Sequence, residues 1–432
     1  MANKKTIEPR TLKGFRDFLP EEQIARQKII DIIRKSYELF GFSPLETPAL
    51  EYAEILSGKY SDEADKQMYQ FKDNGDREVG MRYDFTVPLA RLVAQNGEIK
   101  KPFKRYQVGP LWRAENTQKG RYREFYQSDA DIVGLGSVNA DAEILALSAY
   151  TFRALGVTDF VIRINSRQIL SAFYKKIGLD EKRMTPVIRA VDKLDKMGEA
   201  GVLQELKDGG VPKELAEQIL SFAKVRAGSV SALLAYGKDF GIYDAVADFS
   251  QIIQAALSID SQLPFVVDFS IARGSDYYTG LIFEGQLLKA PQYGAVMAGG
   301  RYDNLIGMFA NKSVPAVGTS IGVDRLFAAL DDLKLIKRES TVTKVLVANF
   351  DEKLGAKYAE TVSLLRQSGI NTEFYFETVD LKKQLSYASD RAIPFVIIIG
   401  SKEAESSKVT LKNMMSGEQQ SLDIKEVVKM LL

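Results

Sequence analysis

The sequence predicts an α+β fold for most of the chain, followed by a separate α/β domain. The segment Lys104–Gly134 combines two strand-like arms with a polar loop, which indicates an antiparallel hairpin. From Leu170 to about Leu257 the apolar residues recur at helical spacing, with glycines between the helices, so this stretch reads as a helical insertion between two strand-rich blocks. From Lys344 onward apolar strands alternate with helices, which is typical of a compact α/β domain with a mostly parallel sheet.

The hairpin has a left arm, Tyr106–Arg113, a polar loop, Glu115–Gly120, and a right arm, Tyr122–Val133. Alternate residues of a strand share a face. The arms are therefore predicted to present polar and aromatic faces, made by Arg113 and Glu115 in one arm and by Arg121, Arg123, Phe125 and Gln127 in the other. Such a pair of strands can offer an anionic nucleotide both charge and a stacking surface.

A surface hairpin of mixed charge is the alternative for this segment. Against it, Gln127, Asp129 and Asp131 continue the polar face into a strand that should be buried. The hairpin therefore favours a binding platform.

The remaining elements follow from local signals. A helix is predicted from Pro20 to Phe40, ended by Gly41, and the prolines that follow suggest a short extended segment at a sheet edge or interface. Residues 67–90 predict a hairpin around Asn74-Gly75, then a strand that enters a helix at Thr86. Near the carboxyl end we expect three strands (344–348, 372–376 and 395–399), helices near 358–366 and 381–388, a hairpin at residues 416–417 and a final helix.

These patterns divide the chain into three predicted parts. Residues 1–330 form the first domain, with the helical insertion at about 170–257. A charged linker covers residues 331–342, and residues 343–432 form the α/β domain.

Composition excludes several classes of chemistry. The chain of 432 residues contains no cysteine, so it has no disulfide and no thiolate nucleophile. It also contains no histidine, which excludes imidazole as a general base, phosphate acceptor, metal ligand or pH switch. No apolar run is long enough to span a bilayer, and the start lacks the apolar core of a signal peptide, so we expect a cytoplasmic protein without membrane contact.

The net charge of +1 gives no overall sign of a nucleic-acid binder. Basic residues are instead concentrated between Lys100 and Arg123. Any contact with a polyanion is expected there.

Besides the hairpin, three segments carry residues suited to one site. The segment GMRYDFTVPLAR (80–91) places Arg82 and Asp84 on one predicted strand face, before a helix that starts at Thr86. IARGSDYYTGLIFEG (271–285) sets arginine, aspartate and tyrosines beside small residues. MAGGRYDNLIGMF (297–309) and AVGTSIGVDRLFAAL (316–330) form a glycine-rich approach to a helix with Arg325. Taken singly, the glycine pair can be a turn, and Asp324-Arg325 a surface ion pair.

Together these segments resemble the histidyl-tRNA synthetase family, a class II aminoacyl-tRNA synthetase family, over essentially the whole chain. ARGSDYYTG and AGGRYDNLIG look like its two histidine-specific signatures. Residues 112–134 and 318–330 look like class II motifs 2 and 3, and the segment around Pro48 is similar to motif 1, the dimer-forming element. The resemblance implies a central antiparallel sheet flanked by helices, a homodimer and a carboxyl-terminal anticodon-binding domain.

The resemblance implies roles for the ATP-binding residues. Arg113 would bind the α-phosphate, Glu115 the adenine amino edge and Arg121 the γ-phosphate, while Phe125 and Arg325 would stack on the two adenine faces. Arg273 would stand beside the α-phosphate, where a guanidinium can bind two phosphoryl oxygens. ATP is expected as a substrate with Mg²⁺ bridging its outer phosphates, and no zinc or haem is expected.

Roles in binding L-histidine are implied in the same way. The ammonium would be bound by Asp84 and Gln127, with Thr86 nearby. The imidazole would lie between Asp131 and Tyr278, with Tyr277 as an additional wall. The catalytic set would be Arg273, Arg113 and Gln127, with Arg273 also close to the histidine. Ser275, Asp324 and Tyr126 depart from the common family residues without removing any of these contacts.

Two other functions share this fold. A regulatory subunit of ATP phosphoribosyltransferase would lack the carboxyl-terminal domain and lose active-site residues, both of which this sequence retains. A class II synthetase for threonine, proline or glycine would lack ARGSDYYTG. The helical insertion can clamp the tRNA acceptor stem or act as scaffold. The absence of histidine fits either selection on an enzyme that supplies histidyl-tRNA, or lineage bias or design.

Overall fold

The computed structural model describes residues 7–58, 65–272, 277–310 and 312–432. Contacts divide the chain into two compact units, Met1–Asp17 with Ile29–Ile336, and Phe18–Lys28 with Lys337–Leu432. None of the helices in the described part combines the length and apolar character needed to cross a membrane.

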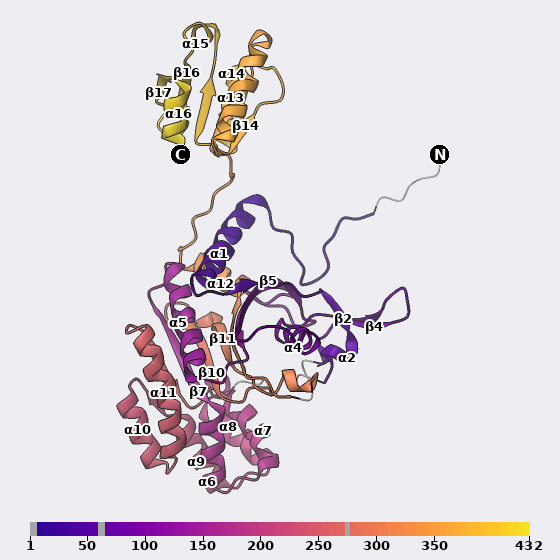
Figure 1. The fold of residues 1–432 in the computed structure, drawn as a ribbon, viewed down its shortest axis with the longest axis vertical. Coiled ribbons are helices and arrows are strands. Elements are labelled where there is room, and N and C mark those ends of the chain that lie inside the picture. The colour runs from indigo at the N-terminus through magenta and orange to yellow at the C-terminus, as the bar shows by residue number, and fades with distance from the viewer. Residues whose placement is uncertain (1–6, 59–64, 273–276, 311) are drawn as a thin grey trace. The chain divides into compact units, whose positions relative to one another are not determined.

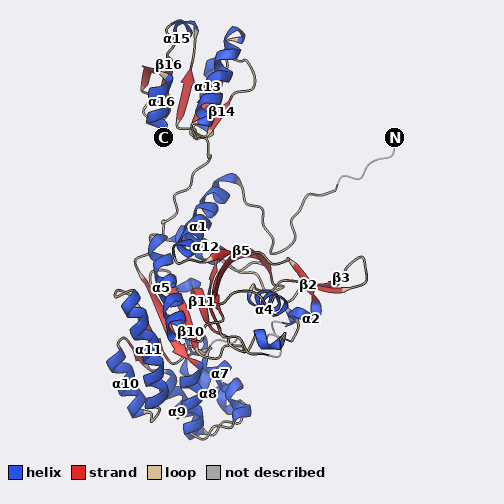
Figure 2. Cartoon of the chain, in the orientation of Figure 1, coloured by secondary structure: helices blue, strands red, loops and turns tan. Residues whose placement is uncertain are grey.

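The first unit is built on a nine-stranded sheet in the order β1-β5-β6-β12-β11-β10-β7-β9-β8. Most neighbours are antiparallel, and only the β1–β5 and β7–β9 pairs of the described sheet are parallel. Figure 2 shows this sheet flanked by helices, so the predicted α+β fold is confirmed. The strands are β1 (Ser43–Pro44), β5 (Phe103–Trp112), β6 (Glu124–Val133), β7 (Phe160–Ser166), β8 (Arg226–Ala227), β9 (Phe265–Asp268), β10 (Leu281–Leu287), β11 (Ala295–Arg301) and β12 (Ala316–Gly322).

The predicted hairpin is formed by β5 and β6, and its register places the polar face at the middle of the sheet. On β6, Gln127, Asp129 and Asp131 have as their β5 partners Gly109, Gln107 and Arg105. Their β12 partners are Gly322, Ser320 and Gly318. β6 therefore has a neighbouring strand on each side, and the side chains of Gln127, Asp129 and Asp131 are buried. The interpretation as a plain surface hairpin is wrong.

Helices cover the sheet on the side of β7 and β10. α5 (Val138–Ala154) is rich in buried alanine and leucine, which lets it pack closely on the strands and on α11 (Tyr243–Ile259) (Figure 1). The predicted amino-terminal helix is α1 (Pro20–Leu39), and Gly41 follows it with φ of 78°.

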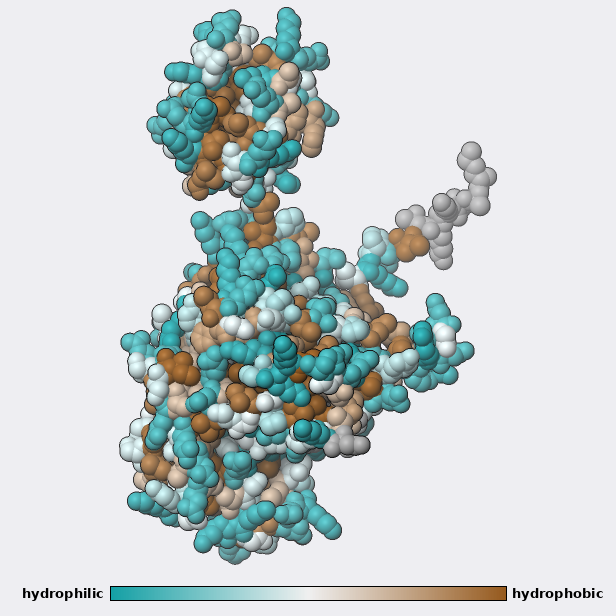
Figure 3. Space-filling view, in the orientation of Figure 1, coloured by the Kyte–Doolittle hydropathy of each residue, from teal (hydrophilic) through white to brown (hydrophobic). Residues whose placement is uncertain are grey.

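The predicted helical stretch is also observed. It comprises α6 (Arg167–Lys176), α7 (Glu181–Val191), α8 (Leu194–Asp208), α9 (Lys213–Ala223) and α10 (Val230–Asp239), then α11. Figure 3 shows mostly hydrophilic and intermediate side chains where α7 to α10 reach the surface in that view.

A small three-stranded sheet precedes the main hairpin. Its order is β2-β4-β3, with β2 (Leu50–Tyr52), β3 (Gln70–Lys72) and β4 (Glu78–Met81). β3 and β4 form the predicted hairpin around residues 74–75. Arg82 and Asp84 were expected on a strand face, but β4 ends before them and both lie in the connection to α4 (Thr86–Gln95). The short helix α2 (Ala53–Leu56) packs on β4 and α4.

The second unit contains a five-stranded sheet in the order β14-β13-β15-β16-β17. β14 (Thr372–Phe374), β13 (Val345–Val347) and β15 (Phe395–Ile398) are parallel, whereas β16 (Val409–Asn413) and β17 (Gln419–Leu422) add antiparallel strands. The predicted α/β domain is thus observed, but its sheet is mixed because the hairpin around residues 416–417 joins the same sheet. Its helices are α13 (Gly355–Gln367), α14 (Leu381–Asp390), α15 (Ser401–Glu405) and α16 (Ile424–Leu431).

The first unit ends with α12 (Val323–Asp332), which directly follows β12. Its amphipathic sequence buries Leu326, Phe327 and Leu330. Arg325 lies in its first turn, next to the sheet.

Candidate active site

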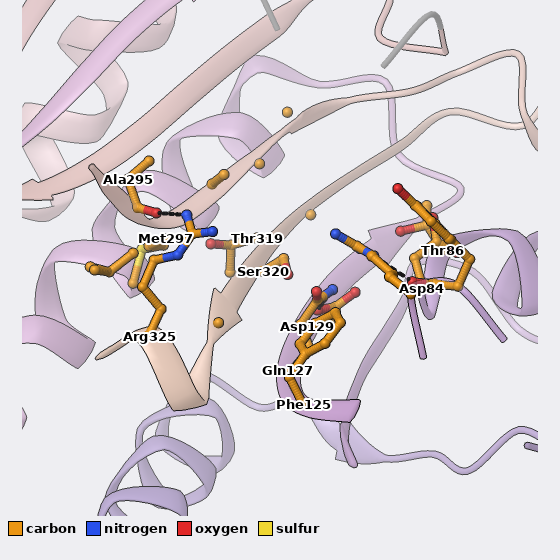
Figure 4. A pocket seen from close by; sticks show the side chains of 18 of the residues that line it. Asp84, Thr86, Phe125, Gln127, Asp129, Ala295, Met297, Thr319, Ser320 and Arg325 are labelled. Carbon is orange, nitrogen blue, oxygen red and sulfur yellow. Dashed lines mark hydrogen bonds between the residues drawn. The ribbon is translucent and has the colours of Figure 1, made fainter. Parts of the chain in front are cut away.

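A cavity of about 340 Å³ lies over the middle strands of the nine-stranded sheet. In Figure 4, Phe125, Gln127 and Asp129 follow one another along β6. Asp84 and Thr86 lie on one side of them, and Arg325 with Ala295 on the other. Segments far apart in the sequence therefore meet at one cavity.

Glycines form the floor of this cavity because no side chain fits there. A Cβ at Gly299 would lie 2.1 Å from the Gly318 carbonyl oxygen, and a Cβ at Gly300 would lie 2.4 Å from the Leu281 carbonyl oxygen and 2.8 Å from the Tyr278 ring. A Cβ at Gly318 would lie 1.9 Å from Asp131 Oδ1. The glycine pair is part of β11, so its reading as a turn is wrong.

Asp131 is a buried carboxylate held by two partners. Its Oδ2 lies 2.7 Å from Arg105 Nη2, and its Oδ1 accepts a hydrogen bond from the Tyr302 hydroxyl. Arg105 is fully buried. Burial raises the pKa of Asp131 against the opposing charge of Arg105, and raises the pKa of Tyr302 well above its ordinary value of 10.0. The Tyr302 hydroxyl therefore remains a hydrogen-bond donor.

Asp129 is the second buried carboxylate, on the same face of β6. Its Oδ1 accepts a hydrogen bond of 2.9 Å from Gln127 Nε2, and the hydroxyl of Ser320 is a further partner. Burial, followed by the negative charge of Asp131, raises the pKa of Asp129 to about 7. The middle of β6 and its β5 partner thus hold two carboxylates and one buried guanidinium, which makes this part of the site suited to a cationic ligand.

Asp84 and Thr86 form the wall at the start of α4. Asp84 Oδ1 accepts a hydrogen bond of 3.1 Å from the Val87 N–H, one of the backbone groups that a helix leaves unpaired at its amino end. Both side chains are buried and line the cavity. This hydrogen bond to the first turn of α4 therefore fixes the Asp84 carboxylate at the site.

Arg113 and Phe125 face each other at the open side of the hairpin. The Arg113 guanidinium lies 4.2 Å from the Tyr83 ring centroid and 5.0 Å from that of Phe125, and its Nε donates to the Tyr83 carbonyl at 3.1 Å. In the connecting loop, Arg121 Nη1 lies 3.7 Å from Glu115 Oε2. These side chains supply positive charge beside aromatic surface, as an anionic nucleotide requires.

Arg325 is oriented by a backbone contact, since its Nη1 donates to the Ala295 carbonyl at 2.8 Å. Asp324 is buried, and it accepts hydrogen bonds from Arg16 Nη2 at 2.7 Å and from the Tyr126 N–H at 2.6 Å. The reading of Asp324-Arg325 as a surface ion pair is therefore wrong. Asp324 instead connects α12 to the start of β6.

Tyr277 and Tyr278 line the cavity, with their ring centroids 4.9 Å apart. The predicted catalytic residue Arg273, and Ser275 beside it, lie outside the described residues. Tyr277 also lies edge-on to Tyr302 at 6.0 Å. Tyr277, in the described part of ARGSDYYTG, therefore contacts Tyr302, whose hydroxyl donates to Asp131.

The cavity brings together the predicted residues that the structure describes, and adds several that the sequence did not single out. The predicted lining residues are Asp84, Thr86, Arg113, Glu115, Arg121, Phe125, Gln127, Asp131, Tyr277, Tyr278 and Arg325. The lining residues that had no predicted role are Asp129, Tyr302, Ser320 and Gly318, and the buried Arg105 contacts Asp131 without lining the cavity. The alternation of β6 pointed to Asp129, whereas Arg105 could be found only from the strand register.

Among the described residues, no group of three or more carboxylates could hold a metal ion. The basic groups that line the cavity, among the described residues, are the guanidinium groups of Arg113, Arg121 and Arg325. This set of side chains does not fit a protein-held Mg²⁺.

Comparisons with known proteins agree with this geometry. The family model described as histidyl-tRNA synthetase matches residues 14–326, and the model described as anticodon binding domain matches residues 344–432. A histidine–tRNA ligase of Rhodopirellula baltica is 43% identical over 423 residues, covering 96% of each chain. The corresponding protein of Wolinella succinogenes is 41% identical and covers 97% of each chain.

Solved structures give the same relation. The crystal structure of histidyl-tRNA synthetase from Nostoc sp. PCC 7120 has a TM-score of 0.89 at 33% identity, covering 99% of this chain and 100% of that one. A structure from Bacillus halodurans, described as an ATP phosphoribosyltransferase regulatory subunit/histidyl-tRNA synthetase, has a TM-score of 0.74. At 21% identity it shows the fold alone, so it does not favour the regulatory alternative.

An antiparallel sheet with an arginine-bearing hairpin, followed by a helix whose arginine reaches the same cavity, defines a class II aminoacyl-tRNA synthetase. The cavity is also lined by Gly299, Gly300 and Tyr302 of AGGRYDNLIG and by Tyr277 and Tyr278 of ARGSDYYTG. With the family model matched over most of the chain, the chain belongs to the histidyl-tRNA synthetase family.

Proposed function

We infer that the chain ligates L-histidine to its cognate tRNA in an ATP-dependent reaction through a histidyl-adenylate, releasing pyrophosphate and AMP. The observation that carries this function is the cavity itself, where arginines and an aromatic face meet two buried carboxylates on one strand. An anionic nucleotide and a cationic amino acid can thus be bound side by side. ATP, histidine and tRNA are the reaction partners.

The first step needs positioning more than acid–base chemistry. A histidine carboxylate oxygen attacks the α-phosphorus of ATP, and the bond from this phosphorus to the pyrophosphate oxygen breaks. A carboxylate is already a nucleophile at neutral pH, so no enzymic base is required. The guanidinium of Arg113 neutralises charge on the α-phosphoryl oxygens. Arg273 has the same role in our proposal, on the strength of the family signature alone.

The adenine lies between Phe125 and Arg325 in this proposal. Phe125 supplies one stacking face beside Arg113, and Arg325 supplies the other from α12, where its bond to the Ala295 carbonyl limits its movement. Glu115 accepts the adenine amino group and Arg121 binds the γ-phosphate. Because these two side chains are 3.7 Å apart, nucleotide binding exchanges their mutual contact for contacts with ATP.

The histidine lies over the glycine floor. Its ammonium is bound by Asp84, Thr86 and Gln127, all buried and lining the cavity. Its imidazole lies between Asp131 and Tyr278, with Tyr277 as a wall. A site that pairs both ring nitrogens rejects analogues that lack them by roughly 10⁴-fold or more.

In the second step the terminal ribose hydroxyl of tRNA attacks the adenylate carbonyl carbon, and the bond from this carbon to the phosphate oxygen breaks, so that AMP leaves. The sequence contains no histidine to act as base, so a phosphate oxygen of the adenylate accepts the hydroxyl proton. A charging rate that depended steeply on a side-chain pKa near neutrality would contradict this step. The helical insertion clamps the acceptor stem, and the second unit binds the anticodon. Deletion of the insertion should then weaken tRNA binding, and unchanged affinity would leave it a scaffold.

Further properties belong to the proposal. Residues 1–330 act as the catalytic domain, 331–342 as a linker and 343–432 as the anticodon-binding domain. Mg²⁺ arrives bound to the ATP phosphates, two copies of the chain form a homodimer through the segment around Pro48, and the enzyme works in the cytoplasm.

ATP–pyrophosphate exchange with each of the twenty amino acids tests the function. We expect exchange with histidine alone, followed by charging of tRNA from the same source. Exchange with threonine, proline or glycine would identify another class II synthetase. No exchange with any amino acid would favour the regulatory subunit. An Arg113→Ala variant, which removes the phosphate contact, serves as the inactive control.

A further inference from the structure

The residue between the two predicted histidine contacts of β6 has no assigned role. Asp129 lies between Gln127 and Asp131 along the same strand face, is only 2% exposed, and lines the cavity. A buried carboxylate has a high cost in free energy unless it is compensated by a partner or a ligand. The free-energy cost of burying the Asp129 carboxylate at the floor of the site must therefore be offset by a contact that it makes there.

Asp131 cannot replace Asp129 in contacting Gln127. Its Oδ2 lies against Arg105 and its Oδ1 accepts the Tyr302 hydroxyl, so both oxygens have partners away from Gln127. Asp129 does contact Gln127, through the 2.9 Å hydrogen bond from Gln127 Nε2 to Asp129 Oδ1.

This hydrogen bond fixes which end of the Gln127 amide faces the ligand. An ionised carboxylate only accepts hydrogen bonds, so the amide must turn its NH₂ group toward Asp129. The Gln127 carbonyl oxygen then points away from Asp129. An oxygen acceptor is what a histidine ammonium requires, whereas the reversed amide would present N–H groups to it.

The charges around Asp129 favour the same ligand group. Within the described part of the chain, no lysine or arginine forms an ion pair with Asp129, and its hydrogen-bond partners Gln127 and Ser320 are uncharged. The neighbouring pair of Asp131 and Arg105 is already balanced. Asp129 therefore contributes negative potential to the cavity without a cation of its own.

We propose that Asp129 is a positioning residue for the amino acid: it holds the Gln127 amide with its carbonyl oxygen toward the histidine ammonium, and its charge favours that ammonium. This inference rests on the proposed function, because it assumes that Gln127 binds the ammonium. It predicts that Asp129 discriminates ligands by their amino group and not by their imidazole.

Three variants separate the contributions. Asp129→Ala removes the hydrogen bond and the charge, while the nearly isosteric Asp129→Asn removes the charge and retains an acceptor oxygen. Asp141→Asn is a matched control, since Asp141 is equally buried and its partner is Arg301, but it does not line the cavity. Assays are made on the full chain at pH 8, above the raised pKa of Asp129 of about 7. Fluorescence of the single tryptophan, the buried Trp112, checks that each variant is folded.

The measurement is the KM for histidine and for ATP in pyrophosphate exchange, together with the Kd of 3-(imidazol-4-yl)propionate, which is histidine without its amino group. For Asp129→Ala we expect the histidine KM to rise roughly 10- to 100-fold, as for loss of a hydrogen bond to a charged group. The ATP KM should stay within about twofold, and the Kd of the propionate should be unchanged. Asp129→Asn should give a smaller rise, and Asp141→Asn none.

A double variant tests whether Asp129 acts through Gln127. In a Gln127→Ala background, Asp129→Ala should raise the histidine KM by much less than in the wild-type background. Equal effects in both backgrounds would overturn the positioning role. An equal loss of propionate binding would overturn it too, because it would place Asp129 at the imidazole. If the wild type itself shows no histidine-dependent exchange, the proposed function fails instead.

Discussion

The raised pKa of Asp129 makes the stability of the first unit depend on pH in a direction that can be tested. Burial and the charge of Asp131 raise the pKa of Asp129 from 3.8 to about 7. A carboxyl whose pKa is higher in the folded state stabilises the fold while it is protonated. That contribution is lost as the pH rises through the folded-state pKa.

The size of the effect follows from the two pKa values. The whole shift corresponds to roughly 4 kcal/mol of unfavourable free energy for the ionised form. Between pH 5 and pH 8 the fold loses roughly 2 to 3 kcal/mol of this contribution, because Asp129 is already ionised in the unfolded state while the folded state holds the proton up to its raised pKa. An Asp129→Asn variant carries no such charge. Its free energy of unfolding should therefore rise relative to the wild type over the same interval.

Thermal unfolding followed by Trp112 fluorescence measures this difference. Trp112 is the only tryptophan and lies in the first unit, so the signal reports that unit within the full chain. We expect the Tm of Asp129→Asn, relative to the wild type, to increase by about 4 °C from pH 5 to pH 8.

A carboxylate at the surface, Asp73, provides the control. In Asp73→Asn the removed charge is on the surface, and its hydrogen bond to Arg77 lowers the pKa, so the relative Tm should not rise with pH. A Tm difference for Asp129→Asn that stays constant from pH 5 to pH 8 would refute the reasoning. The buried negative charge would then not reside on Asp129.

Three further predictions concern the rest of the cavity. Gly318→Ala places a Cβ 1.9 Å from Asp131 Oδ1, so Asp131 or the strand must move. We expect the free energy of unfolding, measured with denaturant, to fall by about 1–3 kcal/mol. The histidine KM should also rise. An unchanged free energy of unfolding together with an unchanged histidine KM would contradict the close packing of Gly318 against Asp131. Tyr302→Phe removes the hydroxyl that donates to buried Asp131, and the histidine KM in pyrophosphate exchange should rise about tenfold while the ATP KM is kept. An increase in the ATP KM alone would argue against a role of the Tyr302 hydroxyl in binding histidine. Arg113→Lys retains charge but not the planar guanidinium, so kcat of exchange should fall by about 10²-fold or more, and a fall of less than threefold would exclude a role at the α-phosphate.

Local sequence patterns predicted the two strands of the hairpin because their alternation and the polar loop are determined within about thirty residues. The same holds for the helical stretch and for α12. The wrong predictions concern features that depend on which strands pair with one another. Arg113, Glu115, Arg121 and Arg123 were expected on strand faces, but they lie between the end of β5 and the start of β6. Arg82 and Asp84 have the spacing of a strand, but β4 ends at Met81 once its register with β2 is complete. The sheet of the second unit is mixed because β16 pairs with β15, which no local signal specifies.

The candidate site divides in the same way. Arg113, Phe125 and Gln127 could be predicted because they lie in one contiguous motif, in which Phe125 and Gln127 alternate along β6 and Arg113 follows the end of β5. Arg105 could not, since an arginine in a strand is ordinarily exposed. It is buried here because the register of β5 on β6 sets it opposite Asp131. Asp324 was misread for a similar reason, because its partner Arg16 is 308 residues away in the sequence.

By itself the sequence determined the class of chemistry: it lacks histidine and cysteine, and it carries the ordered motifs of a histidyl-tRNA synthetase. It also determined which strands and helices carry those motifs, because periodicity and turn residues act over short distances. Only the tertiary structure decided how Asp129, Asp131, Arg105 and Tyr302 share their hydrogen bonds and charges. That division depends on which strands are neighbours and on glycines that leave room for a carboxylate. Burial then raises the pKa of Asp129, an effect that no linear pattern contains.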